Sequence, residues 1–407
     1  MADRIDLKKQ GKLKSNITRF RQDKRLAFTG ALYSLALIGM LACVVFGIFR
    51  YREDLRPENL TRLVSYAKAA GSLTDPFTEY RFEAGLDTAY RPFGMGLAVS
   101  SGDTYSFVSG LGDSSYSIQL RYNDPALCVS DKYVLIYDRD GKSFCVANSY
   151  AEYLRGSLSS PILTASMNRA GAFALVTDEE GCRSAVTVYD SRQRLQCKWL
   201  TAQYYVMFAS VSPDSRYFAA LCLGQNDMAL VTRVLYFEIG QEEASWTADL
   251  GEKQVYSMTH DKSGGLVILC DDGVYRYDRQ GALTASHPFS LPVRLFAAVE
   301  GGEVLVAFET ADRSSRTTQA LVLGDGLEPL WSGSLSGVPR ALDCRGGTAA
   351  LLMNDRLETI RYDGDAVSVR TRPLTGARDV AVNDSGDPIL IYSDRAQRVP
   401  ADSEEQP

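Results

Sequence analysis

The sequence predicts an all-β protein, a β-propeller of about eight four-stranded blades with seven as the alternative, preceded by one transmembrane α-helix. The helix is predicted by 24 consecutive uncharged residues near the N-terminus. The propeller is predicted by a turn and a continuous apolar strand that recur about every forty residues, the spacing of propeller blades. A tyrosine-aspartate turn recurs later in the units and indicates a second hairpin in each.

Composition and charge are typical of a folded domain that does not bind nucleic acid. The 407 residues are 45% hydrophobic and 23% charged, as in ordinary globular proteins. The net charge is -6, but residues 1–26 carry nine Lys or Arg against three Asp, so the rest of the chain carries -12. Binding to phosphate groups needs a clustered cationic face, which so acidic a domain is not expected to have.

Residues 1–25 are expected to form a basic cytoplasmic tail, and residues 26–49 to cross the cell membrane once. Nine basic residues precede the apolar segment, whereas Arg50, Arg52 and Arg56 after it are mixed with acidic residues. The positive-inside rule therefore places the N-terminus in the cytoplasm and residues 50–407 outside the cell. A cleaved signal peptide is the alternative, but its apolar core would be only about 7–15 residues long and would end at a small-residue site.

Residues 50–76 are expected to form a helical stalk or linker, since Pro57 suits a first helical turn and Gly71 a helix end. Residues 77–395 are assigned to the propeller. Residues 396–407 are polar and are expected to be a disordered tail.

Each repeat begins with a turn followed by a buried strand. Glycine in such turns permits positive φ, and Asp, Asn or Ser bonds to the local backbone. The turns begin at Ser130, Asn168, Ser212, Asp261, Glu300, Cys344 and Asn383. The strands that follow are continuous apolar runs, which indicates burial on both faces. They lie at residues 133–137, 172–176, 217–223, 266–270, 304–308, 349–353 and 388–392.

The second landmark is a tyrosine-aspartate turn expected after the third strand. It occurs at Tyr137-Asp138, Tyr189-Asp190, Tyr277-Asp278 and Tyr362-Asp363. The units so defined are 87–124, 125–160, 161–202, 203–250, 251–290, 291–337 and 338–376. A last piece, 377–395, has two clear strands, and residues 79–84 can supply its missing outer strand and close the ring, which removes exposed sheet edges.

Trp199, Trp246 and Trp331 each fall in a predicted fourth strand and are expected to pack at seams between blades. These features resemble the repeats of WD40-like and quinoprotein-like β-propellers, in which a Tyr-Asp-x-x-Gly hairpin precedes a strand that can carry Trp. With its anchor, the chain resembles an uncharacterised family of membrane-anchored propeller proteins of Gram-positive bacteria. That resemblance implies a fold and a location, not an activity.

The sequence indicates no catalytic site, metal site or cofactor. It contains no Gly-x-Ser-x-Gly and no Cys-x-x-Cys, and His260 and His287 have no spaced partner ligand, so both are expected to be surface or structural histidines. The seven cysteines of the domain are expected to be buried free thiols, with one or two disulfides as the alternative.

We therefore expect no enzyme but a membrane-tethered, extracytoplasmic interaction or scaffold module whose partner is an envelope protein, a peptide or a glycan. A ligand sensor, or a quinone- or Ca²⁺-dependent enzyme that uses the central channel, is the alternative. An assembly factor for other membrane proteins shares the same scaffold. The connections between second and third strands are expected to share one face and to be long at 177–184, 224–228 and 309–319. Their polar residues Asn226, Asp227, Arg313 and Arg316 are the candidate partner surface.

Overall fold

The computed structural model describes residues 33, 35–42, 79–81, 88–94, 96–101, 103–109, 114–226, 229–309, 317–362 and 367–399. The chain divides into two units, Met1–Thr61 and Arg62–Pro407. In the first unit, residues 33 and 35–42 are helical, and the other residues of the predicted span 26–49 lie outside the described residues. No helix among the described residues combines the length and the apolarity needed to cross a membrane. The predicted tail 1–25 and stalk 50–76 also lie outside the described residues.

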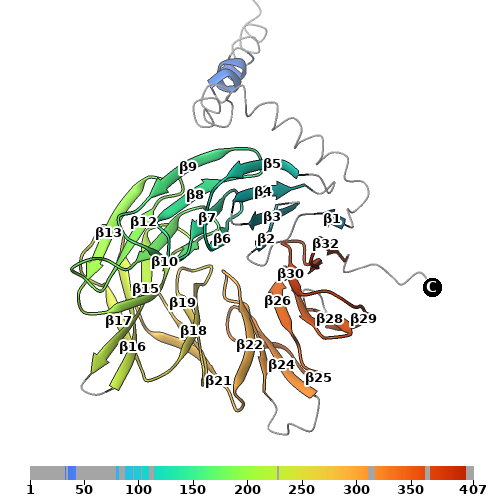
Figure 1. The fold of residues 1–407 in the computed structure, drawn as a ribbon. Helices are drawn as coiled ribbons and strands as arrows, with labels where there is room; N and C mark the ends of the chain where they lie inside the picture. The colour runs from blue at the N-terminus through green and yellow to red at the C-terminus, as the bar shows by residue number, and fades with distance from the viewer. Residues whose placement is uncertain are drawn as a thin grey trace, which may run out of the picture. The chain divides into compact units, whose positions relative to one another are not determined.

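The second unit is a β-propeller, and the prediction of eight blades is confirmed. Within the described residues, 32 strands form eight antiparallel sheets of four strands each. Figure 1 shows these sheets arranged around a common centre. Because the sheets follow one another along the chain, the blades are numbered here in chain order.

The first four blades lie close to their predicted limits. Blade 1 has β2 (Ala89–Phe93), β3 (Gly96–Ser101), β4 (Thr104–Val108) and β5 (Ser114–Gln119). Blade 2 has β6 (Pro125–Val129), β7 (Val134–Asp138), β8 (Ser143–Ala147) and β9 (Glu152–Ser157). Blade 3 has β10 (Ile162–Met167), β11 (Phe173–Thr177), β12 (Ser184–Tyr189) and β13 (Leu195–Thr201). Blade 4 has β14 (Tyr205–Val211), β15 (Tyr217–Asn226), β16 (Ala229–Glu238) and β17 (Trp246–Gly251).

The last four blades complete the ring. Blade 5 has β18 (Val255–His260), β19 (Leu266–Cys270), β20 (Gly273–Tyr277) and β21 (Leu283–Pro288). Blade 6 has β22 (Val293–Ala298), β23 (Val304–Phe308), β24 (Thr317–Leu323) and β25 (Pro329–Ser336). Blade 7 has β26 (Ala341–Arg345), β27 (Thr348–Leu352), β28 (Arg356–Arg361) and β29 (Ser368–Pro373). Blade 8 has β30 (Asp379–Val382), β31 (Pro388–Ile391), β32 (Arg395–Arg398) and β1 (Glu79–Arg81).

The ring closes inside blade 8, as predicted. The N-terminal strand β1 pairs with β32, with Tyr80 opposite Ala396, and supplies the outer strand of this sheet. The predicted end of the propeller at residue 395 is wrong, because β32 runs from Arg395 to Arg398. Only Ala396 and Val399 of this short polar stretch are buried apolar residues, which is why it resembled a tail. Residues 400–407 lie outside the described residues.

The innermost strand of each blade borders a central channel. Each innermost strand contacts the innermost strand of the next blade, and the last contacts the first. In order, these strands are β2, β6, β10, β14, β18, β22, β26 and β30. The second strands lie between neighbouring blades, and β7, β11, β19, β23, β27 and β31 are buried throughout. The outer strand β29, in contrast, is largely exposed. The burial of the second strands confirms the prediction that the continuous apolar runs are strands buried on both faces.

Hydrophobic clusters fill the seams between blades. One cluster joins Leu221 and Tyr236 of blade 4 to Met258 and Ile268 of blade 5. Each fully buried aliphatic side chain of this kind contributes about 1.5–3 kcal/mol. All three tryptophans lie in fourth strands at such seams, as predicted. Trp246, for example, stacks on Tyr236 with ring centroids 4.9 Å apart.

The predicted turns are confirmed, with one exception, where the structure describes them; Asp363 of the Tyr362-Asp363 turn lies outside the described residues. Asn168 Oδ1 accepts a hydrogen bond from the backbone N–H of Ala172 at 2.9 Å, and Asp278 Oδ1 accepts one from that of Ala282 at 2.8 Å. Tyr137-Asp138, however, ends the second strand β7, not a third strand. Asp138 Oδ1 there accepts the backbone N–H groups of Asn123 and Asp124 at 2.8 and 2.9 Å, an arrangement that depends on tertiary structure and not on a local turn.

Candidate functional site

The central channel has two differently built mouths. All innermost strands run in the same direction, so the turns between first and second strands collect on one face, called here the turn face. The connections between second and third strands collect on the other, called the loop face. Both faces hold candidate sites, because pockets and grooves in rigid scaffolds form where several elements converge.

A charged pocket of about 200 Å³ lies at the turn-face mouth. Its lining comes from every blade except the fourth, so it must lie at the centre of the ring. The charged side chains that line it include Asp131, Arg169, Lys262, Glu300, Arg345 and Asp384. Positive and negative groups are therefore mixed around one small space, which suits mutual pairing more than the binding of a strongly charged ligand.

Most of these charges pair across blade boundaries. Arg169 Nε lies 3.0 Å from Asp131 Oδ1, and Arg345 Nη1 lies 3.2 Å from Asp384 Oδ1. Glu300 differs, because it accepts a hydrogen bond from the backbone N–H of Arg169, while its buried Oε1 has no hydrogen-bond partner among the described residues. Burial raises the pKa of Glu300 to about 7. The pocket is thus a polar closure of the channel with one carboxyl group that titrates near neutrality.

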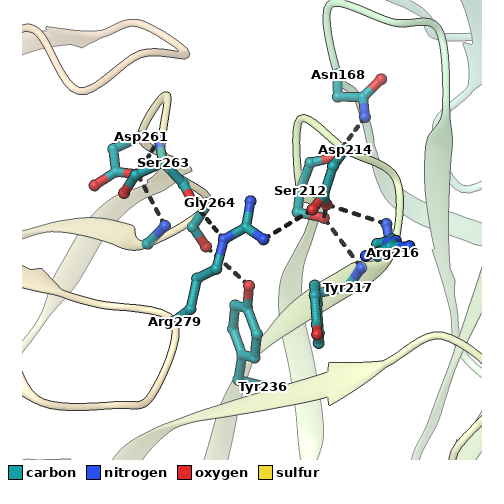
Figure 2. Close-up of polar contacts among 11 residues, drawn as sticks. Asn168, Ser212, Asp214, Arg216, Tyr217, Tyr236, Asp261, Ser263, Gly264 and Arg279 are labelled. Atoms are coloured by element: carbon teal, nitrogen blue, oxygen red, sulfur yellow. Dashed lines mark hydrogen bonds and ion pairs between the residues drawn. The ribbon is translucent and has the colours of Figure 1, made fainter.

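Polar bonds also tie the turns of blades 3, 4 and 5 together (Figure 2). Asn168 Nδ2 donates to the carbonyl oxygen of Ser212 at 2.7 Å, and the Ser212 hydroxyl donates to Asp214 at 2.7 Å. Arg279 then bridges the next seam, with Nη1 2.9 Å from Asp214 and Nε donating to the carbonyl oxygen of Ser263. These hydrogen bonds and this ion pair connect three neighbouring blades on the turn face.

His260 is buried in the seam between blades 4 and 5, with only 1% of its surface exposed, so it is not a surface histidine. Its Nδ1 lies 3.0 Å from the Ser210 hydroxyl, while Nε2 has no hydrogen-bond partner among the described residues. Burial lowers the pKa of His260 to about 3. The neighbouring Asp261 carboxylate does not bond to His260 or Ser210. It bonds instead to Ser263 and, at 2.8 Å, to Arg276.

The cysteines are thiols buried to different degrees. Cys145, Cys222, Cys270 and Cys344 are buried, and Cys128, Cys182 and Cys197 are partly buried; all seven are free. The expected burial is therefore found for four of these seven cysteines. No group of three or more His, Cys, Asp or Glu in the described part of the chain is placed to hold a metal ion.

The loop-face mouth contains a repeated irregularity on one half of the ring. In blades 3 to 6, the innermost strand carries a β-bulge next to the end of the second strand. The extra residues are Leu163, Met207, Tyr256 and Arg294. The innermost strands of blades 1, 2, 7 and 8 pair without such a shift over their described residues. A bulge at the rim of a sheet redirects a side chain, and here it does so in four successive blades.

Large apolar side chains at or beside these bulges are exposed or partly exposed. Met207 is 53% exposed and the neighbouring Tyr205 is 54% exposed. Leu163 and Phe296 are each 37% exposed, and the ring of Phe296 stacks on that of Tyr256 with centroids 5.5 Å apart. We call these five residues the apolar arc. They belong to innermost strands of neighbouring blades, so they border one side of the channel opening.

Acidic side chains lie on the loop face of the same blades as most of the apolar arc. Asp178, Glu180, Glu252 and Asp271 are exposed in the connections of blades 3 to 5 on this face, and none of them forms an ion pair with another described residue. Most of the nearby basic groups are engaged; the exception is Arg294 at the blade 6 bulge, which is exposed and forms no ion pair with another described residue. Lys198 pairs with Glu179, Lys253 pairs with Asp272, and the Arg183 guanidinium lies over the Tyr205 ring, 5.0 Å from its centroid. The rim therefore has excess negative charge.

Only Asn226 of the four residues of the predicted partner surface belongs to the described residues. Asn226 ends β15 opposite Ala229, and Asp227, Arg313 and Arg316 lie outside the described residues. The predicted long loop at residues 224–228 is wrong, because β15 and β16 each extend to ten residues and stay paired as far as Asn226 and Ala229. The sequence did not identify the apolar arc, since Leu163, Met207 and Tyr256 look like ordinary strand residues until the pairing register shows the bulges.

Comparison with known proteins shows a family and a fold. The family described as "Family of unknown function (DUF5711)" matches residues 74–303. The structure is similar to that of BamB from Moraxella catarrhalis, with a TM-score of 0.53 and 12% identity over 80% of this chain and 98% of that one. It is also similar to the C-terminal WD40 domain of Sif2, with a TM-score of 0.55 and 9% identity over 80% of this chain and 98% of that domain. No curated protein matches the sequence. At these identities the structural likeness concerns the propeller fold alone.

Proposed function

The chain belongs to the family of unknown function DUF5711, and we propose that it is a membrane-tethered interaction module whose propeller stands outside the cytoplasm. The apolar arc is the observation that carries this proposal. Folded proteins rarely leave a contiguous group of large apolar side chains in water, and such groups mark binding surfaces. Here they are presented by the innermost strands of a closed ring, which fixes their positions before a partner arrives.

The tether is supported by the sequence of residues 1–49. The apolar segment 26–49 is long enough to span a bilayer, and the basic tail before it favours an N-terminus in the cytoplasm. Protease added to intact protoplasts is expected to digest the propeller and to leave residues 1–25 protected. Full protection of the propeller until the membrane is broken would contradict this orientation.

The interaction role is tested by photo-crosslinking in native membranes. A photoreactive residue is placed at Met207 in the full chain, and a matched control carries it at Leu283, which is also 53% exposed but lies on the outer strand of blade 5. We expect an adduct with another protein from position 207 and none from position 283. Absence of an adduct at position 207, or equal adducts at both positions, would count against the proposal.

A further inference from the structure

We infer that the partner of the apolar arc is a protein segment that inserts one large apolar side chain at the loop-face mouth and carries lysine or arginine on both sides of it. This inference rests on the proposed function and specifies the chemistry of the partner. It depends on three features of the described residues: the shape of the mouth, the chemistry of its wall and the charge of its rim.

The shape of the mouth favours a single inserted side chain over a flat interface. The apolar arc lies on the innermost strands β10, β14, β18 and β22, which contact one another in sequence around the channel. Its members therefore border a common opening, and a segment that lies across the opening can contact neighbouring members with one inserted side chain. Central, desolvated anchor residues of this kind carry most of the binding energy in protein interfaces.

The wall of the mouth combines a fixed part and an adaptable part. The stacked rings of Tyr256 and Phe296 form a rigid aromatic surface, with centroids 5.5 Å apart. Met207 and Leu163 lie on the adjoining blades, and methionine adapts readily to the shape of an apolar partner. Such a wall suits an aromatic or a long aliphatic side chain, since aromatic pairs gain energy beyond the area that they bury.

The rim determines which segments can place that side chain. Four exposed carboxylates have no cationic partner among the described residues: Asp178, Glu180, Glu252 and Asp271. Lys198 and Lys253 are neutralised by their own carboxylates, whereas Arg294 at the blade 6 bulge is an exposed cation that forms no ion pair with another described residue, one charge against these four. A segment with basic residues on both sides of its anchor is attracted to this rim, and an acidic segment is repelled. The same charge disfavours nucleic acid and anionic lipid, and it gives a neutral glycan no advantage.

The test measures peptide binding to the full chain in a neutral detergent by fluorescence anisotropy. Three labelled peptides of equal length are compared: one with a central Trp flanked by lysines, one with glutamates in place of the lysines, and one with Ser in place of the Trp. We expect the lysine-Trp peptide to bind about tenfold or more tightly than either other peptide. Its affinity should fall as the salt concentration rises from about 50 mM to about 500 mM, because the rim is exposed.

Two variants locate the binding site. Met207→Ser is expected to weaken binding of the lysine-Trp peptide about tenfold, and Leu283→Ser, changed at an equally exposed position, is expected to leave it unchanged. Both positions are exposed, and unaltered melting temperatures will show that both variants fold.

Each outcome is decisive. The inference is overturned by any one of three results. These are equal binding of the three peptides, tighter binding of the glutamate peptide, and no effect of Met207→Ser on binding of the lysine-Trp peptide. If the crosslink at position 207 forms in membranes while the peptides fail in this way, the interaction role stands and only the basic, apolar segment is wrong. If no crosslink forms, the interaction role itself is wrong.

Discussion

The buried histidine at the seam between blades 4 and 5 should make the propeller sensitive to acid. The pKa of His260 is lowered to about 3 in the folded chain, against an ordinary value of 6.5 in the unfolded chain. The unfolded state therefore takes up a proton at a higher pH than the folded state. The stability that comes from the neutral ring is present above pH 6.5 and is lost as the pH falls from 6.5 towards 3.

The size of the effect follows from these two values. At pH 5 an unfolded histidine is almost fully protonated, whereas His260 in the folded chain stays neutral. Since each pKa unit corresponds to 1.36 kcal/mol, the free energy of unfolding should fall by about 2 kcal/mol between pH 7 and pH 5 on account of this residue alone. Other titrating groups add to the total, so the contribution of His260 must be isolated with a variant.

His260→Gln is that variant, because glutamine keeps a polar group near Ser210 and does not titrate. Urea unfolding is followed by the fluorescence of Trp199, Trp246 and Trp331, which all lie in the propeller seams. Wild type should lose about 2 kcal/mol more than the variant between pH 7 and pH 5. Ser210→Ala is the control: it should lower stability by about 1 kcal/mol at both pH values and keep the pH dependence. An equal pH dependence in wild type and His260→Gln would refute the reasoning.

Three further predictions concern the closure and packing of the ring. Glu300→Gln should stabilise the protein by about 1–3 kcal/mol at pH 8.5 and by little at pH 4. The reason is that the carboxyl pKa of Glu300, raised to about 7, makes the stability of the wild type fall as the pH rises through that value. Urea unfolding at both pH values measures the difference. Trp246→Ala should lower the free energy of unfolding by about 3–5 kcal/mol, since it removes the stacking on Tyr236 and the hydrogen bond from Nε1 to the carbonyl oxygen of Arg279. A drop in melting temperature smaller than that of a surface variant would contradict this prediction. Tyr80→Ala should cost a similar amount by loosening the closing strand, while Arg81→Ala beside it, with a largely exposed side chain, should change stability by less than about 0.5 kcal/mol.

Most of the fold is predictable from the sequence because its signals are local and repeated. A turn such as Asn168 to Gly171 bonds to its own backbone, and Gly171 adopts a φ of 91°, a conformation that favours glycine. The continuous apolar strands are equally local, since their burial between blades requires no knowledge of their neighbours. Even the closing strand at Tyr80 could be inferred, because blade 8 lacked one strand and only the N-terminal segment remained to supply it.

The candidate site was harder to predict because it depends on register. Leu163, Met207 and Tyr256 are the extra residues of bulges, and a bulge is defined only by which residue pairs with which across two strands. The extension of β15 and β16 into a hairpin has the same origin. Polar residues near Asn226 suggested a loop, yet ladder pairing continues to the end of both strands. The pairing across blades of Asp131 with Arg169 likewise has no sequence signature.

The most direct test of the interaction role is a map of photo-crosslinks around the loop-face mouth in native membranes. A photoreactive residue is placed in turn at Leu163, Met207 and Phe296 of the apolar arc, and at Ala89 and Ala341, which begin the innermost strands of blades 1 and 7. The arc positions should give an adduct with a common partner, and the other two should give none. Adducts spread evenly around the ring, or confined to blades 1 and 7, would contradict the proposed binding surface.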